Sequence, residues 1–532
     1  MKTLSISIIL ILSPFFGYAQ IIGPEDPDID TFNTIRQNSV STMAAFGDTV
    51  WISPALNRNI GNAVDWFYPE NAVEVTNGEG RVFSLSLAQD TVIAGLGFSA
   101  ESPDGFVPSG YGFYTSINGG ESWKFIDFPL DSEPPSSCEP AAETYDSICD
   151  IEFQYGDETY TRIRTTVPQQ SPPYSVDSKG DVIFAAAWAS GLLRSTDFGD
   201  SWEKVILPPS SVDNLNPEED YQWTSSYSGE IINRYDPRGD NNLLGFGVLI
   251  DSQDRLWFGS AGGINISENA LTAPTDNISW KHISFNNTSD GLLGDWIITI
   301  KEDPQTNRIW LTNWIADQPQ QQGLVYTDDV GESFTQVLKG ERINDIGFKD
   351  GYIFAAGDNG LFISEDGGKS WIKSPQIKSP NTFIKPSAQY FTVASTTERV
   401  WIGTDDGIAS TNDYGFSWEI TRVDFPLSGG NRYAPAAREV STYAYPNPFS
   451  PTVHEVIRIK FEVKQQGNVR IRIFDFGMNL VREVENGSFG PGTYEAVWDG
   501  VDGKGRKVAN APYLYIIETK GREINGKILV AD

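Results

Sequence analysis

Histidine and cysteine are scarce in this 532-residue chain, which has two of each. Ser-His-Asp and Cys-His catalysis both need a histidine beside the nucleophile, and His282 and His454 are the candidates. Two cysteines and two distant histidines also do not make a structural zinc site, which needs a set of such ligands close together. We therefore expect neither triad chemistry nor a bound metal or cofactor.

Basic residues are also few, with 39 Lys and Arg against 71 Asp and Glu and a net charge of −32. Proteins that bind nucleic acids use basic patches that displace counterions from the phosphates. An anionic membrane surface would repel such a chain as well. The charge therefore predicts no nucleic-acid partner, and self-repulsion favours a monomer.

Long apolar runs are confined to the N-terminus, which reads MKTLSISIILILSPFFGYAQ. Lys2, a short apolar core from Leu4 to Phe16 and small residues up to Ala19 predict a secretory signal peptide over residues 1–19. Loss of Lys2 on cleavage would change the net charge from −32 to −33. Because no later stretch reaches about 18 apolar residues, we expect no transmembrane segment. The protein is expected to be secreted, or held at a bacterial cell surface.

The cysteines, Cys138 and Cys149, lie eleven residues apart in a polar, Pro-rich segment. In the oxidising compartment that a signal peptide implies, they are expected to form a disulfide. A loop this short would add about 2–3 kcal/mol of stability at most.

Residues 20–34 form an acidic segment after the predicted cleavage site. Asp26, Asp28 and Asp30 alternate like the first ligands of a calcium loop, but the Gly and the closing Glu of an EF-hand are missing. We interpret the segment as a flexible acidic N-terminus.

One short frame, Ser/Thr-x-Asp/Asn-x-Gly-x-Ser-Trp/Phe, recurs five times. A short acidic or amide side chain can accept hydrogen bonds from nearby backbone N–H groups, and glycine takes the positive φ that a tight turn requires. An active site needs one constellation, so five copies predict turns between strands. The aromatic residue of each copy is expected to begin the next strand and to pack into the core. The copies are Ser116/Asn118/Gly120/Trp123, Ser195/Asp197/Gly199/Trp202, Thr327/Asp329/Gly331/Phe334, Ser364/Asp366/Gly368/Trp371 and Thr411/Asp413/Gly415/Trp418.

This frame resembles the Asp-box, or BNR repeat, of sialidases, sortilin-type receptors and photosystem-assembly propellers. The resemblance implies a β-propeller with these turns on the outer hairpins of the blades, away from the central ligand face. The family mixes hydrolases, receptors and assembly factors, so the resemblance does not imply one activity.

Short β-rich runs before the turns support this fold, namely DVIFAAAW (181–188), DRLWFGS (254–260), GYIFAAG (351–357) and ERVWIG (398–403). Each run is followed by a strand that begins with Gly, and we interpret each unit as a four-stranded blade. One unit carries the longer turn ENALTAPTDNISW, and the first has DTVWIS without the frame. The fold class is therefore all-β, with a seven-bladed propeller over residues 35–425. Six or eight blades remain alternatives, because the first and last strands could close one blade together.

A second module is expected after a linker at residues 426–442. Residues 443–532 open with YAYPNPFSP and continue with alternating strands at Ile457–Phe461 and Val469–Phe474, which predicts a small Ig-like β-sandwich. The stretch resembles FlgD-type Ig-like domains and the C-terminal sorting domains of type IX secretion cargo. The matching residues are Tyr445, Pro446, Asn447, Pro448, Phe449, Asp475, Gly477, Gly492, Tyr494, Trp498, Asp499, Gly500, Gly505, Tyr513, Gly526 and Lys527. The resemblance implies the secretion machinery as a partner, with the module either a sorting signal or a spacer domain.

Long loops provide the candidate ligand site. Residues 129–174, 208–244, 98–110 and 314–323 are expected to open on one face of the propeller and to form a binding rim. Aromatic side chains beside carboxylates suit sugars or peptides. In these loops we single out Tyr155, Tyr160, Trp223 and Tyr235, and note Tyr145, Tyr174, Tyr221 and Tyr227. The alternative is that these rings only anchor the loops onto the propeller.

Two functions are compatible with these features. The first is a secreted or cell-surface, non-catalytic binding or scaffold propeller with a glycan or surface-protein ligand. The second is an extracellular, sialidase-like glycoside hydrolase, which needs two suitably spaced carboxylates and arginines that hold the substrate carboxylate. Arginines are present at Arg58, Arg162, Arg164, Arg234 and Arg238, but the usual Arg-Ile-Pro signature is missing. No catalytic residue is therefore assigned.

Overall fold

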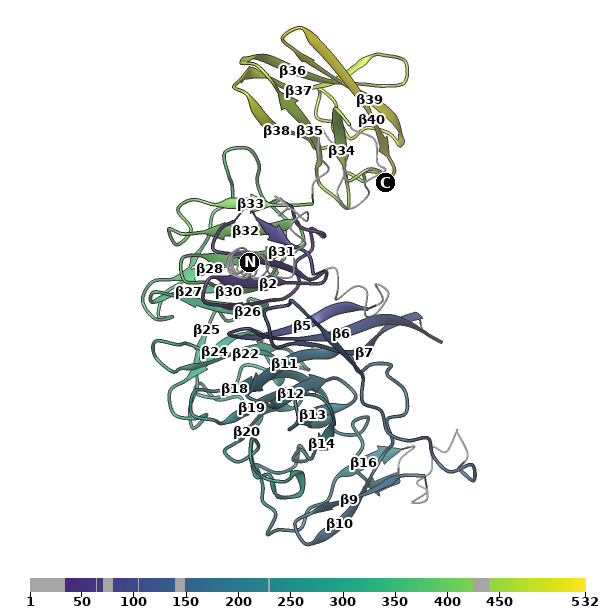
Figure 1. The fold of residues 1–532 in the computed structure, drawn as a ribbon, viewed down its shortest axis with the longest axis vertical. Coiled ribbons are helices and arrows are strands. Elements are labelled where there is room, and N and C mark those ends of the chain that lie inside the picture. Colours follow the sequence, from purple (N-terminus) through teal and green to yellow (C-terminus); the bar gives the residue numbers. More distant parts are fainter. Residues whose placement is uncertain are drawn as a thin grey trace, which may run out of the picture. The chain divides into compact units, whose positions relative to one another are not determined.

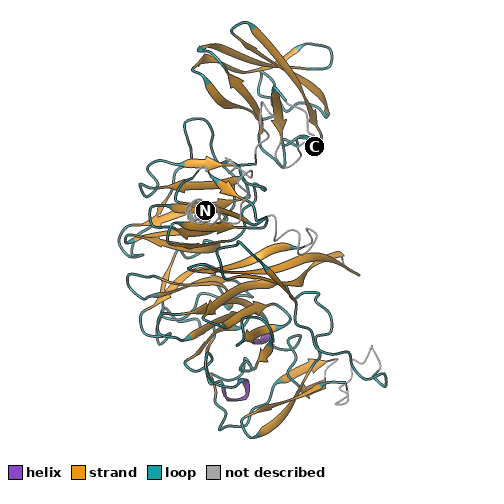
Figure 2. Ribbon diagram, viewed as in Figure 1, coloured by secondary structure: helices purple, strands orange, loops and turns teal. Residues whose placement is uncertain are grey.

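The computed structural model describes residues 34–63, 65–69, 80–103, 105–138, 149–227, 230–423 and 440–532. The predicted signal peptide, Asp26–Asp30, Tyr145 and most of the expected linker lie outside these residues. The chain divides into two compact units: unit 1 runs to Ser374 and includes Gln389–Phe416, and unit 2 comprises Pro375–Ala388 and Ser417–Asp532. Strands dominate both units, and the described helices are two short 3-10 turns, η1 (Asn241–Leu243) and η2 (Thr275–Asn277) (Figures 1 and 2). Neither of them is long and apolar enough to cross a membrane.

Antiparallel sheets of four strands follow one another along the chain (Figure 1). The first two are β1 (Met43–Phe46), β2 (Thr49–Ile52), β3 (Asn57–Ile60) and β4 (Trp66–Phe67), then β5 (Arg81–Ala88), β6 (Thr91–Ser102), β7 (Gly105–Ser116) and β8 (Lys124–Asp127). The third is β11 (Pro173–Lys179), β12 (Val182–Ala187), β13 (Gly191–Ser195) and β14 (Glu203–Val205). The fourth is β18 (Gly245–Ile250), β19 (Leu256–Ser260), β20 (Gly263–Ser267) and β21 (Trp280–Ile283), with β15 (Asn214–Leu215) as a fifth strand beside β21.

Three more sheets repeat the pattern. They are β22 (Trp296–Glu302), β23 (Ile309–Trp314), β24 (Gly323–Thr327) and β25 (Thr335–Val337); β26 (Ile343–Lys349), β27 (Tyr352–Gly357), β28 (Gly360–Ser364) and β29 (Ile372–Lys373); and β30 (Tyr390–Ser395), β31 (Val400–Thr404), β32 (Gly407–Thr411) and β33 (Glu419–Thr421). Two hairpins stand apart from these sheets: β9 (Ile151–Tyr155) with β10 (Glu158–Arg162), and β16 (Thr224–Tyr227) with β17 (Glu230–Asn233).

The first strands of successive sheets contact one another in the order β1, β5, β11, β18, β22, β26 and β30, and β30 contacts β1. The sheets therefore form a closed ring, which is the arrangement of a β-propeller. At the closure the Val40 N–H donates to the Thr404 carbonyl (2.9 Å), and the Gly407 N–H donates to the Asn38 carbonyl (2.7 Å). Trp66 and Trp401 pack edge to face there, with ring centroids 5.6 Å apart. The described β1–β4 and β30–β33 belong to separate sheets.

The middle strands of the sheets are buried on both faces, which explains their apolar and small residues. Every residue of β13, β19, β20 and β31 is buried. Glycines near the ends of the second strands leave room for the chain that enters the next sheet. A Cβ at Gly259 would lie 2.5 Å from the Ile297 carbonyl oxygen, and one at Gly403 would lie 2.6 Å from that of Val40.

The five recurring turns share one hydrogen-bond pattern. In the turn at Ser364, the Ser364 hydroxyl donates to Asp366 Oδ1 (2.9 Å) and accepts from the Gly368 N–H (2.9 Å). Asp366 Oδ1 also accepts from the Ser370 N–H (2.9 Å). The first two bonds recur in the turns that begin at Ser116, Ser195, Thr327 and Thr411. Each turn is thus closed locally by three groups: a hydroxyl, a carboxylate or amide oxygen, and the N–H of the glycine.

The first and last copies of the frame show that the pattern tolerates variation. Asn118 replaces the usual Asp in the first copy, and its Oδ1 still accepts from the Ser116 hydroxyl (2.9 Å). In the last copy Asp413 accepts from the Thr411 hydroxyl (2.7 Å), which itself accepts from the Gly415 N–H (2.9 Å). Gly415 has a φ of +101°, in the left-handed region. An amide can therefore replace the carboxylate, because the acceptor oxygen is what closes the turn.

The glycine of the frame has a positive φ and lies against the preceding sheet. Gly368 has a φ of +86°, and a Cβ on it would lie 2.4 Å from Cη2 of Trp310 in β23. These turns therefore set how closely neighbouring sheets approach at their outer edges. The same close approach occurs for Gly120 with Trp51 (2.6 Å), Gly199 with Ile126 (2.4 Å) and Gly331 with Ile283 (2.7 Å).

The aromatic residues of the frames correct the prediction in two respects. Phe334 and Trp418 are buried, at 4% and 7% exposed, but Trp123, Trp202 and Trp371 are only half-buried. These three tryptophans pack against the core clusters from their edge, so the expectation of a core residue holds for them only in part. The expectation that the aromatic residue begins the next strand is wrong, because β8, β14, β25, β29 and β33 each begin one residue later.

The half-buried rings lie over the turn at the outer edge of their sheets. Trp371 Nε1 donates to the Gly368 carbonyl (3.1 Å), and its ring packs edge to face on Trp310, with centroids 6.3 Å apart. One side of the ring thus contacts the preceding sheet while the other stays near solvent. The corresponding contacts are those of Trp123 with Trp51 (5.5 Å) and of Trp202 with Phe113 (4.5 Å).

Replacing Gly368 by Ala is expected to destabilise the protein more than replacing Gly351, which has the same φ of +86° but no neighbour nearer than 3.7 Å to the added Cβ. Both changes strain left-handed backbone by about 1–2 kcal/mol. The clash with Trp310 should add about 1–3 kcal/mol for Gly368→Ala. Urea denaturation followed by Trp fluorescence measures the difference, and equal losses would contradict the close contact between sheets.

Unit 2 contains two antiparallel sheets around one apolar core. One is β34 (Thr442–Tyr445), β35 (Ile457–Val463) and β38 (Gly492–Trp498). The other is β37 (Leu480–Phe489), β36 (Gly467–Phe474), β39 (Ala511–Thr519) and β40 (Arg522–Val530). Phe449, Trp498 and Tyr515 are buried between them. The segment Pro375–Ala388 joins this unit through bonds such as that from the Thr382 hydroxyl to Glu495 Oε2 (2.6 Å).

Candidate functional site

A cavity of about 850 Å³ lies at the centre of the ring in unit 1. Residues of all seven first strands, β1, β5, β11, β18, β22, β26 and β30, line it within the described part of the chain. It falls within the range of about 300–1,000 Å³ that small-molecule sites occupy. The ring of sheets thus provides a rigid wall for a ligand.

The pairing of first and second strands is interrupted near the start of β5, β11, β18, β26 and β30. At each interruption one residue of the first strand has no partner on the second, as in a β-bulge, which turns a side chain away from its regular direction. The unpaired residues are Phe83, Tyr174, Phe246, Asn344 and Phe391, and all of them line the cavity. The bulges therefore aim four aromatic rings at the cavity.

Five rings form a continuous aromatic surface, which we call the aromatic mouth: Phe83, Tyr174, Trp188, Phe246 and Trp296. The ring centroids of Phe83 and Tyr174 are 6.1 Å apart, and those of Tyr174 and Phe246 are 6.0 Å apart. Phe246 also contacts Trp296 (5.4 Å) and Trp188 (4.8 Å). Tyr174 is 36% exposed. The mouth lies where the chain enters the first strands, and it presents apolar ring faces to a ligand.

Asp177 of β11 is a carboxylate in the cavity wall. Its Oδ2 accepts from the Ile250 N–H (2.7 Å), and its Oδ1 accepts from the Ser178 N–H (2.8 Å) and the Ser86 hydroxyl (3.3 Å). Since Ser86 lies on β5 and Ile250 on β18, the carboxylate links three neighbouring first strands. Burial raises the pKa of Asp177 to about 6, although the hydrogen bonds oppose this shift.

Asp345 of β26 links the next three first strands. Its carboxylate forms an ion pair with Lys301 Nζ on β22 (2.8 Å). It also accepts from the Thr392 hydroxyl (2.8 Å) and the Val393 N–H (2.9 Å) on β30. Both carboxylates thus hold the wall together, and their oxygens are engaged by groups of the protein.

Replacing Asp177 by Asn is expected to change how stability depends on pH. The folded-state pKa of about 6 lies above the usual Asp value, so the folded state binds the proton more tightly. The stability from this proton is fully present below about pH 4 and is lost as the pH rises through about 6. The melting temperature of the parent chain should therefore fall relative to Asp177→Asn between about pH 4 and pH 7. Parallel melting profiles would contradict this.

The carboxylates of the recurring turns are unsuited to proton donation. Hydrogen bonds from the hydroxyl group of the serine four residues later lower the pKa values of Asp197, Asp329 and Asp366 to about 2. These groups are therefore ionised at neutral pH, and a general acid must carry a proton. None of the residues named in the five frames lines the central cavity.

The expected rim residues do not form a rim, and that prediction is wrong for three of them. Tyr155 and Trp223 are 1% exposed and Tyr235 is 8% exposed. The Tyr155 hydroxyl donates to the Ile278 carbonyl (2.9 Å), and Trp223 Nε1 donates to the Leu207 carbonyl (2.9 Å). Tyr160 is partly buried against the same cluster. A side chain with so little exposed surface offers no face to a ligand.

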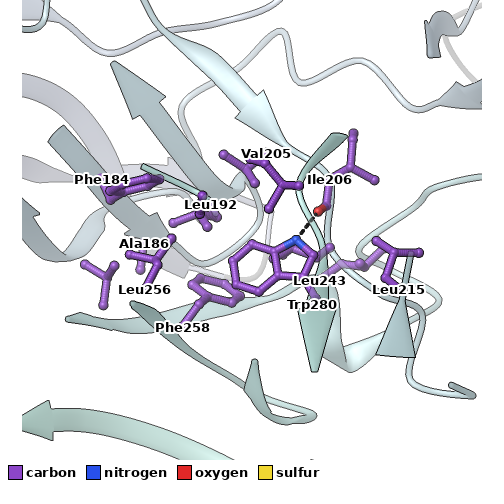
Figure 3. Packing of buried hydrophobic residues seen from close by; sticks show 14 of the residues in the cluster. Phe184, Ala186, Leu192, Val205, Ile206, Leu215, Leu243, Leu256, Phe258 and Trp280 are labelled. Carbon is purple, nitrogen blue, oxygen red and sulfur yellow. Dashed lines mark hydrogen bonds between the residues drawn. The ribbon is translucent and has the colours of Figure 1, made fainter. Parts of the chain in front are cut away.

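These rings join an apolar cluster beside the outer strands of the third and fourth sheets. The cluster includes Val205 and Ile206 at the end of β14, and Trp280 of β21, whose Nε1 donates to the Ile206 carbonyl (2.9 Å) (Figure 3). The hairpin of β9 and β10 lies at an outer edge of unit 1 (Figure 1), and β9 and β14 both contact η2. Burial of the aromatic side chains offsets the entropy lost in ordering two long insertions. Among the noted loop residues whose side chains the structure describes, Tyr174 is the one that lines the cavity.

The arginines that a sialidase would need are bound to acidic or carbonyl groups of the protein. Arg162 Nη1 and Nη2 donate to the two oxygens of Asp131 (2.6 and 2.8 Å). Arg234 and Arg238 both pair with Asp236, at 2.9 and 2.7 Å. Arg164 donates to the Cys149 carbonyl (2.8 Å), and Arg58 donates to the Gly119 carbonyl (2.6 Å). None of these five arginines lines the central cavity.

Cys138 and Cys149 form the expected disulfide, with their Cα atoms 5.6 Å apart. His282 is buried, its Nδ1 lies 3.1 Å from Asn265 Oδ1, and burial lowers its pKa to about 4. In the described ranges no three His, Cys, Asp or Glu side chains are grouped to hold a metal ion.

The C-terminal motif residues hold the end of the chain. The Phe449 N–H donates to the Leu529 carbonyl (2.8 Å), and the Ala531 N–H donates to the Phe449 carbonyl (2.9 Å). Asn447 Nδ2 donates to the Lys527 carbonyl (2.9 Å). The Tyr445 hydroxyl donates to the Glu495 carboxylate, and Pro446 and Pro448 flank Asn447 in the sequence. Trp498 Nε1 donates to the Val501 carbonyl, and the Asp499 carboxylate accepts from the Val501 N–H. Gly500, between them, has a positive φ.

Comparisons with known proteins find similarity at the level of structure. No family model and no curated protein matches the sequence. Ycf48 from Cyanidioschyzon merolae is 15% identical, with a TM-score of 0.42, over 71% of this chain and 96% of that one. PorZ, a surface component of the type-IX secretion system of Porphyromonas gingivalis, is 10% identical, with a TM-score of 0.33, over 93% of this chain and 75% of that one.

A GH74 enzyme from Niastella koreensis is also similar, with 10% identity and a TM-score of 0.46, over 94% of this chain and 75% of that one. All three TM-scores are below 0.5, so these likenesses assign no function. The β-propeller assignment rests on the strand pairing and the closed ring of first strands.

Proposed function

We propose that this protein is a secreted or cell-surface, non-catalytic binding propeller of seven blades, exported with a C-terminal sorting-like module. The aromatic mouth carries the proposal. Its rings are packed against one another, yet Tyr174 keeps 36% of its surface exposed. A ligand that covers these rings would remove apolar surface from water, at about 25 cal/mol per Å².

The ligand class that fits is a neutral glycan or a peptide with apolar side chains. Sugar rings and apolar side chains both stack on aromatic faces, and nearby hydroxyl and amide groups such as Ser84, Asn344 and Thr299 supply polar contacts. An acidic ligand would be repelled by the net charge of −32 and by Asp177. The mouth therefore favours uncharged or basic ligands.

Non-catalytic binding is supported by the state of Asp177 and Asp345, two of the three carboxylates that line the cavity in the described part of the chain. Asp177 and Asp345 each accept hydrogen bonds from two neighbouring strands. A general acid or nucleophile must present an oxygen to the substrate, and these oxygens instead connect the wall. The turn hydrogen bonds and the successive four-stranded sheets support the interpretation as an Asp-box propeller.

Export is the second part of the proposal. The predicted signal peptide and the disulfide both favour an extracellular location. Phe449 is buried and fixes the last strand, whereas Asn447 and Pro448 are exposed beside it, and these two residues offer a surface that a secretion machinery could recognise.

A glycoside hydrolase is the second candidate, favoured by one observation. Asp177 lies in the cavity, and burial raises its pKa to about 6, a value suited to a general acid. It ranks below binding because the carboxylate is held by the Ile250, Ser178 and Ser86 groups.

A thermal-shift screen of the chain without residues 1–19 tests the proposal, using neutral and acidic oligosaccharides, cell-wall fragments and short peptides. A ligand at about 100-fold its Kd should add about 2.7 kcal/mol of stability. Tyr174→Ala should weaken binding at least tenfold. Ile372→Ala is the matched control, because Ile372 is also solvent-facing (66% exposed) but lies on β29 and does not line the cavity.

Two results would contradict the binding proposal. One is a panel in which no compound shifts the melting temperature, or in which Tyr174→Ala has no effect on the shift. The other is release of hydrolysis products that Asp177→Asn abolishes, which would support the hydrolase instead.

A further inference from the structure

A second groove, of about 440 Å³, lies at the outer edge of unit 1 between β9 and β14. Four consecutive residues of β9, Ile151–Gln154, line it, together with Glu203 and Lys204 of β14. Because side chains alternate between the two faces of a strand, consecutive lining residues place the groove along the strand edge. In the described part of the chain, β9 pairs with β10 alone and β14 pairs with β13 alone. Two unpaired strand edges therefore border one groove.

We propose that this groove binds an extended, net-basic peptide segment of a partner protein as an added strand between β9 and β14. Unpaired edge strands present free N–H and C=O groups, and peptides commonly bind by completing such edges. This site is separate from the aromatic mouth and goes beyond the proposed function.

The backbone of β9 directs N–H and C=O groups into the groove. Tyr155 and Glu158 flank a two-residue turn and are directly opposite each other, as are Gln154 and Thr159. In such a hairpin the flanking pair is hydrogen-bonded and the next pair is not. The N–H and C=O of Gln154, and by the same alternation those of Glu152, therefore face away from β10 and toward the groove.

Contacts at both ends of the groove fix the hairpin of β9 and β10 relative to the third sheet. At one end Arg162 of β10 pairs with Asp131 (2.6 Å), and Lys204 of β14 reaches the same carboxylate (3.4 Å) and the Thr165 hydroxyl (2.6 Å). Three partly buried charges thus connect the hairpin to the third sheet.

At the other end both strands contact η2. The Gly156 N–H donates to the Asp276 carbonyl (2.9 Å), and Arg194 donates to the carbonyls of Ala270 (2.8 Å) and Ala273 (2.6 Å) just before η2. A site fixed in this way loses little conformational freedom when a peptide binds.

The size of the groove suits a short strand. β14 has three residues, and an extended chain rises about 3.3 Å per residue. The bordering edges would therefore pair with three or four residues of the partner, with the remainder of the segment passing over the surface.

The charge around the groove favours a basic partner. Glu152 is exposed, the Glu203 side chain is 51% exposed and Asp276 lines the same groove. The three basic side chains that line it are largely buried, with Arg162 12%, Arg194 4% and Lys204 15% exposed. The accessible charges are thus mainly acidic, in a chain whose net charge is already −32.

The test is selection of a phage library of random linear octapeptides on the chain without residues 1–19. Enriched peptides should carry Lys or Arg. Their binding should be weakened at least tenfold by Gln154→Pro, which removes the N–H that faces the groove. Pro is tolerated at edge positions whose N–H does not pair, so the hairpin should persist. Gln154→Ala is the matched control, because it also loses the side-chain bond to Thr159 but keeps the N–H.

Circular dichroism and the melting temperature check that both variants fold. Selective loss of peptide binding in Gln154→Pro, with melting curves like those of Gln154→Ala, supports the proposal. Absence of enriched peptides, or equal binding to both variants, would overturn it. A dimer of the chain that Gln154→Pro dissociates would assign the groove to a second copy and would overturn the partner assignment.

Discussion

The contact between neighbouring first strands around the central cavity is the constraint on which the rest of unit 1 depends. Each first strand must lie beside the next at a distance that closes the ring. Side chains complete the joints: Asp177 connects β5, β11 and β18, and Asp345 connects β22, β26 and β30. Because these groups are needed to join the wall, they are poor candidates for chemistry. The same packing leaves an open centre that a ligand can enter.

The aromatic mouth and the groove between β9 and β14 follow from two different interruptions of regular pairing. At the mouth, bulges at Phe83, Tyr174 and Phe246 turn rings toward the centre of the ring. At the groove, the hairpin of β9 and β10 lies beside the third sheet without pairing with it. The bulges at the mouth present aromatic side chains, whereas the unpaired strand edges at the groove present backbone N–H and C=O groups. The two surfaces are therefore suited to ligands of different chemistry.

Much of the fold could be predicted from local sequence. The Ser-x-Asp-x-Gly pattern at Ser364 specifies its own hydrogen bonds within five residues, so it could be recognised without knowing the rest of the chain. The longer turn of the fourth sheet still begins with Ser267 bonded to Asn269 (3.0 Å), and Asn269 accepts from the Ser279 N–H (3.0 Å). That turn was harder to recognise because the insertion separates its two halves. The available signal for this turn is the Ser267-x-Asn269 pattern followed ten residues after Asn269 by Ser279-Trp280.

Local sequence specifies the strands, the turns and the disulfide, since each depends on residues close together in the chain. Which aromatic residues are buried and which stay exposed at the cavity depends instead on long-range packing. Tyr155 and Tyr174 both fall in the long loop predicted over residues 129–174, yet one is 1% and the other 36% exposed. Likewise Phe334 and Trp371 hold the same place in their frames, but the first is buried and the second only half-buried. These differences arise from strand register and from packing against partners far away in the sequence, so no single segment encodes them.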